Sequence, residues 1–218
     1  MVTGQSAGSK RTRPTLRIAL VIATLLGACT SGPSAPEEDS GNYIKEVEDA
    51  RAEKDRLFFA DTETIPVAKR AVFLPLKYYP VDPAFKIPAS LKLSNDRPVF
   101  DMPTSTGTNR KMQRVGVLTF TLQGTPMSLE SFVEAGTQQI TSLFVPFADL
   151  TTGMETYSAG RYLDLKPTAT GFYVIDFNLA YNPTWECPYP PSANRLKVAI
   201  LAGEKAPPEA PAAKAPGA

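Results

Sequence analysis

The segment VGVLTFTLQGTPMSLESFV (residues 115–133) decides the fold class. In residues 115–122, leucine and phenylalanine side chains occupy one face and valine and threonine side chains, Val115 among them, the other. This two-residue period is typical of a half-buried β-strand. Gly124 follows, and residues 127–133 form a second apolar run. The segment therefore predicts an antiparallel hairpin with a short turn.

Further short apolar runs surround this hairpin, without a second helical period between them. They are residues 70–76, 87–93, 140–147, 161–165, 172–177 and 196–201. Closely spaced strands of this kind favour a mainly β fold: an antiparallel barrel or a sandwich. The two architectures are left open by the pattern.

One helix is predicted, over residues 43–59, and it should pack outside the sheet. Its apolar side is formed by Tyr43, Val47, Ala50 and Leu57. Its other side carries two charge pairs at the i,i+4 spacing that stabilises helices, Lys45/Asp49 and Arg51/Asp55.

The chain begins with the three parts of an export signal in residues 1–28. A basic stretch precedes the apolar run Ile18–Ala28, which is too short to span the ~30 Å hydrocarbon core of a membrane. The ending Leu26-Gly27-Ala28-Cys29 resembles the bacterial lipobox, in which the cysteine sulfur is acylated before cleavage. The alternative is an ordinary secretory signal with a chance cysteine. Lipidation at Cys29 predicts a membrane-anchored protein of the bacterial cell envelope, with its domain outside the cytoplasm.

Composition divides the remaining chain into three parts. Residues 29–41 are small, polar and proline-containing, which predicts a flexible tether. Residues 42–205 form a single β-rich domain, and the proline- and alanine-rich residues 206–218 form a disordered tail.

Charge and composition exclude several functional classes. Four of the 23 basic residues and none of the 22 acidic ones precede Cys29, so the chain from there on has a net charge of −3. This gives nucleic-acid binding no electrostatic support. The sequence contains no histidine, and Cys187 is the only cysteine besides Cys29. We therefore expect no metal site, no cofactor, no internal disulfide, and a monomer.

Specific motifs begin at Phe144. The most distinctive are Glu155-Thr156-Tyr157 with Gly160-Arg161-Tyr162, Asp176-Phe177-Asn178 with Ala180-Tyr181-Asn182-Pro183, Cys187-Pro188 with Pro190-Pro191, Asn194-Arg195-Leu196, and AGEK at residues 202–205. With LKYYPVDPAFK (residues 76–86), these motifs resemble the bacterial family catalogued as domain of unknown function 1684. The resemblance extends from the predicted helix to residue 205 and implies no function. Relatives typically have more residues between the asparagine-proline and cysteine-proline motifs, which here are Asn182-Pro183 and Cys187-Pro188, and they often carry a second cysteine. Any thiol-pair chemistry of those relatives therefore does not carry over to this chain.

The same region gathers seven candidate binding or structural residues: Glu155, Tyr157, Arg161, Asp176, Asn178, Asn182 and Arg195. Alternation places Asp176 on an apolar side of its strand, where a carboxylate needs a partner. Arg161 or Arg195 is the predicted partner. Asn178 and Asn182 are predicted to cap the turn before Pro183.

Three interpretations of this polar cluster follow. It is a structural network, or an anion- or polyol-binding pocket with Tyr157 and Trp185 as walls, or a site where Asp176 and Glu155 act as paired carboxylates on a glycoside. The structural network is the favoured interpretation of the cluster itself. Three functions of the whole protein stay open: a non-enzymatic envelope lipoprotein that binds a small polar ligand or a partner protein, a carboxylate-dependent hydrolase, and a purely structural envelope factor. The first is favoured, so an enzyme is not expected.

Overall fold

The predicted hairpin lies at the centre of the sheet. The computed structural model describes residues 1–4, 8, 40–61, 65, 67–104, 106–183 and 188–207. Strand β3 (Asn109–Leu122) pairs antiparallel with β4 (Thr125–Glu134) through the turn Gln123-Gly124. Both turn residues have positive φ, 49° and 80°, as a two-residue hairpin turn of type I′ requires.

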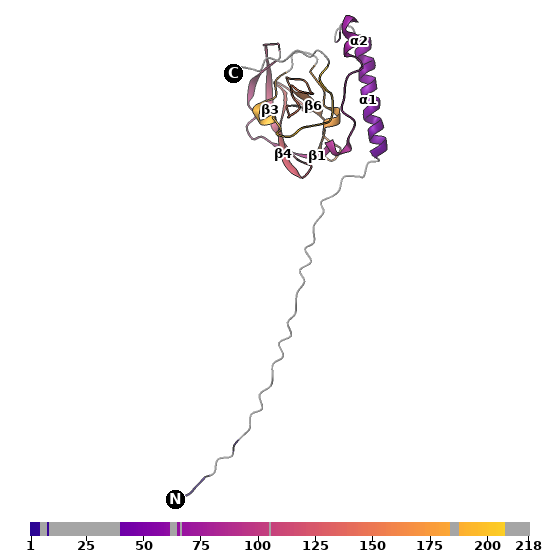
Figure 1. Ribbon diagram of the computed structural model, residues 1–218. Helices are drawn as coiled ribbons and strands as arrows, with labels where there is room; N and C mark the ends of the chain where they lie inside the picture. Colours follow the sequence, from indigo (N-terminus) through magenta and orange to yellow (C-terminus); the bar gives the residue numbers. More distant parts are fainter. Residues whose placement is uncertain are drawn as a thin grey trace. The chain divides into compact units, whose positions relative to one another are not determined.

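Six strands form a nearly closed antiparallel barrel around this hairpin (Figure 1). The others are β1 (Lys86–Leu93), β5 (Leu143–Phe147), β6 (Arg161–Leu165) and β7 (Tyr173–Asp176). Hydrogen bonds link them in the order β6-β5-β4-β3-β1-β7. Since β7 pairs with β1, the chain returns to its first barrel strand and leaves a gap only between β6 and β7. Of the two architectures that the sequence left open, the barrel is confirmed and the sandwich is not.

Side chains fill the interior of the barrel. Leu118, Leu129, Val145 and Ile175 come from four different strands and are fully buried in one core. A register shift between Arg114 and Gly116 turns Val115 into the same core, whereas simple alternation placed it on the opposite face. A bulge has this effect because one extra residue inverts the facing of the residues before it.

Three predicted strands differ from the structure. Residues 70–76 contain the helix α2 (Arg70–Phe73), preceded by the 3₁₀ turn η1 (Val67–Lys69), and not a strand. The Arg70 guanidinium donates to the carbonyls of Ile65 and Asp61, which holds this turn in place. Residues 196–201 form no strand, and the strand predicted from residue 140 begins at Leu143. An additional strand, β2 (Val99–Pro103), pairs with the first part of β3.

Helix α1 (Ser40–Ala60) covers the outside of the barrel, as predicted. Tyr43 and Val47 are buried, and the Lys45/Asp49 ion pair is present. The predicted Arg51/Asp55 pair is wrong. Arg51 instead donates to two barrel-side carbonyls, of Tyr79 (2.9 Å) and Asn178 (3.1 Å), and the Asp55 carboxylate accepts the N–H of Leu76. These bonds fasten α1 to the rest of the domain.

Short 3₁₀ turns complete the described elements. They are η2 (Pro83–Phe85), η3 (Phe177–Leu179) and η4 (Ser192–Asn194). No helix of the described residues is long and apolar enough to cross a membrane. The predicted lipobox with Cys29, nearly all of the predicted leader and tether, the tail beyond Pro207, and the candidate residues Trp185 and Cys187 lie outside the described residues.

Candidate functional site

Arg161 lies at the start of β6 and is completely buried. Its Nη2 donates to Asp149 Oδ2 at 2.7 Å and to the carbonyl of Ile200 at 2.9 Å, and its Nη1 donates to the carbonyl of Ala202. The other Asp149 oxygen accepts both the N–H and the hydroxyl of Thr151, at 2.7 and 2.6 Å. The carboxylate is therefore neutralised and hydrogen-bonded on both oxygens, as a buried charge requires.

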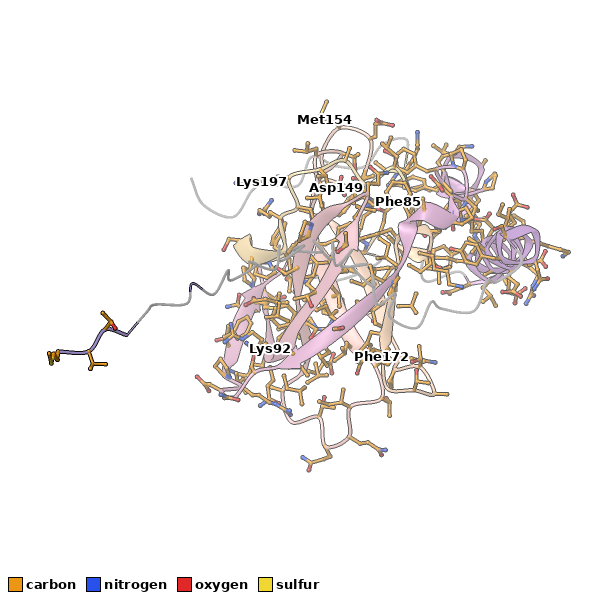
Figure 2. The ribbon with its side chains drawn as sticks, turned by 90° about the horizontal axis from the view of Figure 1, so that it is seen from below. Phe85, Lys92, Asp149, Met154, Phe172 and Lys197 are labelled. Carbon is orange, nitrogen blue, oxygen red and sulfur yellow. The ribbon has the colours of Figure 1, made fainter. Side chains whose placement is uncertain are left out.

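This pairing corrects the prediction for Arg161. Its carboxylate partner is Asp149, not Asp176. Asp149 follows β5 and lies at one end of the barrel strands, with Lys92 and Phe172 toward the other end (Figure 2). The irregular segment 196–201 supplies a carbonyl to the same guanidinium.

Asp176, at the end of β7, is bound by a tyrosine. The Tyr43 hydroxyl lies 2.8 Å from both carboxylate oxygens, and the N–H of Asn178 donates to Oδ1 at 3.0 Å. Burial raises the pKa of the Asp176 carboxyl, and these hydrogen bonds oppose the rise. Burial and the neighbouring carboxylate also raise the pKa of the Tyr43 phenol. Asp176 thus anchors the first turns of α1.

The Asn178 amide serves the same junction, and not the turn before Pro183. It donates to the Tyr43 hydroxyl (3.0 Å) and the Asp82 carbonyl (2.8 Å), and its oxygen accepts the Asp82 N–H (3.0 Å). Asn182 lies elsewhere, with its amide donating to the Lys205 carbonyl at 2.7 Å. The two asparagines are therefore in separate networks.

The remaining predicted residues lie nearer the surface. Glu155 is exposed and forms an ion pair with Lys205 at 3.2 Å. Tyr157 is half-buried, and Arg195 is exposed at the end of η4, where its backbone pairs with Ala148. The structure therefore divides the predicted cluster among several places.

Glu204 is a buried carboxylate whose role the sequence did not indicate. Only 3% of its surface is exposed. It forms an ion pair with Lys54 of α1 and accepts the N–H of Asn182 at 2.7 Å and the Tyr78 hydroxyl at 3.5 Å. Burial and the Glu204 carboxylate raise the pKa of the Tyr78 phenol. Glu204 is a second clamp on α1, nearer its C-terminal end.

A pocket of about 260 Å³ opens beside this clamp. Its walls come from α1, from residues 65–77 with η1 and α2, and from two C-terminal stretches. The lining residues are Phe58, Ile65, Lys69, Phe73, Leu76, Lys77, Asn182, Pro183, Glu204, Lys205 and Pro207. We call this site the helix pocket. Most of its lining is apolar, and three of the lining residues are lysines (Lys69, Lys77 and Lys205).

A smaller pocket of about 180 Å³ lies at the gap between β6 and β7. Its polar members include Asp164, which accepts the Tyr181 hydroxyl at 2.7 Å, and the already bonded Asp176. Within the described ranges, no group of three or more histidine, cysteine, aspartate or glutamate residues is placed to hold a metal ion.

These features define a small antiparallel β-barrel protein with an outer helix clamped to it by buried carboxylates. Residues 71–205 match the family described as "Protein of unknown function (DUF1684)", and the chain belongs to this family. The match confirms the resemblance but starts after α1. A solution structure of an uncharacterised protein from Haloarcula marismortui is 35% identical, with a TM-score of 0.61, over 79% of this chain and 98% of that chain. No curated protein matches the sequence.

Proposed function

We propose that this protein is a cell-envelope lipoprotein whose barrel domain is a non-enzymatic binding module, and that its ligand occupies the helix pocket. The observation that carries the proposal is the pocket itself: a cavity of about 260 Å³ with mostly apolar walls and several polar groups at its edge. Ligand sites in proteins have this composition.

The buried polar networks do not compete with the helix pocket for this role. Arg161 and Asp149 satisfy each other and the surrounding backbone, and Asp176 is bonded to Tyr43 and Asn178. Buried networks of this kind stabilise a particular packing. The helix pocket therefore remains the candidate ligand site.

The carboxylates of the hydrolase alternative have separate partners. Glu155 is paired with Lys205, and Asp176 with Tyr43. Glu204, the carboxylate that lines the helix pocket, is held by Lys54 and by the N–H of Asn182. A general acid or base must exchange a proton with substrate, whereas Asp176 and Glu204 are engaged in holding the fold and Glu155 lies in an exposed ion pair. This favours binding over hydrolysis.

Two walls of the helix pocket belong to the motifs that carry the family resemblance. Asn182 and Pro183 come from the AYNP motif, and Glu204 and Lys205 from the AGEK motif. Residues far apart in sequence thus meet at one concave surface. The envelope part of the proposal rests on residues 1–28, which have the pattern of an export signal, and on the ending at Cys29, which resembles a lipobox.

Native mass spectrometry tests the proposal. The full chain, purified from its own envelope in mild detergent, should retain a small molecule. The variant Leu76→Trp, which fills the helix pocket with an indole ring, should lose that added mass. The control Leu201→Trp makes the same change at an exposed position that does not line the pocket. A ligand retained equally by both variants would place the binding site elsewhere.

A further inference from the structure

The charges around the helix pocket do not balance. Lys69 and Lys77 line it, and no carboxylate of the described residues forms an ion pair with either. The negative charge of Glu204 is already compensated by Lys54 and by the N–H of Asn182. The described lining residues thus include three lysines and one carboxylate, which is an excess of positive charge.

The rest of the lining is mostly apolar and partly aromatic, with Phe58 and Phe73 among its residues. The ring of Phe73 lies 6.0 Å from Lys69 Nζ. Ile65, Leu76 and Pro183 complete the lining. An apolar surface with cations at its edge matches a molecule with a hydrocarbon body and an anionic head.

The volume limits the size of that molecule. At about 260 Å³ the helix pocket lies just below the ~300–1,000 Å³ of sites for drug-sized ligands. We infer that the helix pocket binds a small amphipathic carboxylate, with its hydrocarbon part on Phe58, Phe73 and Leu76 and its carboxylate between Lys69 and Lys77. This inference rests on the proposed function and adds the chemical class of the ligand.

Titration calorimetry with three eight-carbon probes tests the charge selection: octanoate, 1-octanol and octylamine. We expect octanoate to bind about tenfold more tightly than octanol, and octylamine to bind most weakly. The double variant Lys69→Met/Lys77→Met should reduce octanoate affinity about tenfold and leave octanol unchanged. Both lysines are exposed, so these substitutions should leave the fold intact. Lys92→Met, toward the far end of the barrel from Asp149 (Figure 2), is the matched control.

The outcomes separate the inference from the proposed function. Equal affinity for the three probes, or an unchanged octanoate affinity in the double variant, overturns the charge assignment while leaving a binding pocket. No binding of any probe, with no ligand retained in native mass spectrometry, overturns both. Binding to vesicles of anionic phosphatidylglycerol without binding of octanoate also overturns the inference, because it points to a membrane surface and not to a free carboxylate.

Discussion

The guanidinium of Arg161 lies 2.7 Å from the carboxylate of Asp149, and neither side chain has any exposed surface. The pair lies at one end of the barrel, where it also binds backbone that belongs to no strand. A buried ion pair that also hydrogen-bonds the surrounding backbone holds irregular chain in one arrangement. The most conspicuous charged residue of the domain therefore stabilises the scaffold.

Removing Arg161 should be strongly destabilising. Arg161→Ala leaves the Asp149 carboxylate buried without its counter-charge, which costs about 3–5 kcal/mol. Urea denaturation measures this loss as a decrease in the free energy of unfolding. Arg195→Ala, at an exposed position, should change it by no more than about 0.5 kcal/mol.

The double variant Arg161→Met/Asp149→Leu gives the coupling between the two residues. Removing both charges leaves no unpaired ion, so the double variant should lose less stability than the sum of the two single variants. Additive losses would mean that the two side chains act independently.

The Asp176 carboxyl should make stability depend on pH. Its pKa is raised in the folded protein, chiefly by burial, so the folded state holds the proton more tightly than the unfolded chain. The stabilisation is fully present below about pH 4, the ordinary pKa of aspartate, and is lost as the pH rises through the folded pKa. The unfolding free energy of the parent minus that of Asp176→Asn should therefore decrease as the pH rises from about 4.

This difference isolates Asp176 because the other titrating groups are common to both proteins. Asp96→Asn, at an exposed position, controls for the removal of one negative charge. A parent that gains stability over the same pH range, relative to Asp176→Asn, would show that the pKa is lowered and that the hydrogen bonds from Tyr43 and Asn178 outweigh burial.

The clamp between Lys54 and Glu204 should control the attachment of α1. Lys54→Met leaves the buried Glu204 carboxylate with two weaker partners and should cost about 1–3 kcal/mol, less than a fully buried pair because Lys54 is partly exposed. Hydrogen exchange of the α1 amides should accelerate more than that of β3. Adding Glu204→Gln should recover part of the loss, and equal acceleration throughout the barrel would argue against a local clamp.

The sequence predicted those parts of the fold that depend on local pattern. The alternation in residues 115–133 predicts a hairpin because facing and turn chemistry are local properties, and the structure has it. The partner of Arg161 could not be predicted in this way, since Asp149 and Asp176 are both plausible until the strands are placed. Asp176 and Tyr43 are 133 residues apart, and Lys54 and Glu204 are 150 apart. Only the folded barrel brings these groups together.

The helix pocket was not predicted for the same reason. Phe58, Phe73 and Pro183 belong to three separate stretches, and residues 70–76 were expected to form a strand. A single-sequence signal was nevertheless present: the basic residues Lys69, Arg70 and Lys77 flank the apolar run AVFLPL (residues 71–76). Basic residues around a short apolar run become informative only when the run is known to be helical.

Lipid anchoring should depend on one sulfur. Cys29→Ala removes the atom that would be acylated, so the protein should leave the detergent phase in phase partition and retain its leader on a gel. An acyl anchor adds about 0.8 kcal/mol of membrane affinity per buried methylene, so the change should be close to complete. Unchanged partition and unchanged mobility would refute the lipobox interpretation and leave the barrel domain unaffected.

The location of the binding site is the central claim, and chemical-shift mapping tests it most directly. In ¹H–¹⁵N spectra of the ¹⁵N-labelled chain from Ser40 onward, kept at constant pH, octanoate should shift the amides of Phe58, Phe73, Asn182 and Lys205. The backbone amides of Arg161 and Asp149, which do not line the helix pocket, should stay in place. Shifts centred on Arg161 and Asp149, or on Asp164 and Asp176 at the gap between β6 and β7, with the helix-pocket amides unmoved, would contradict the account.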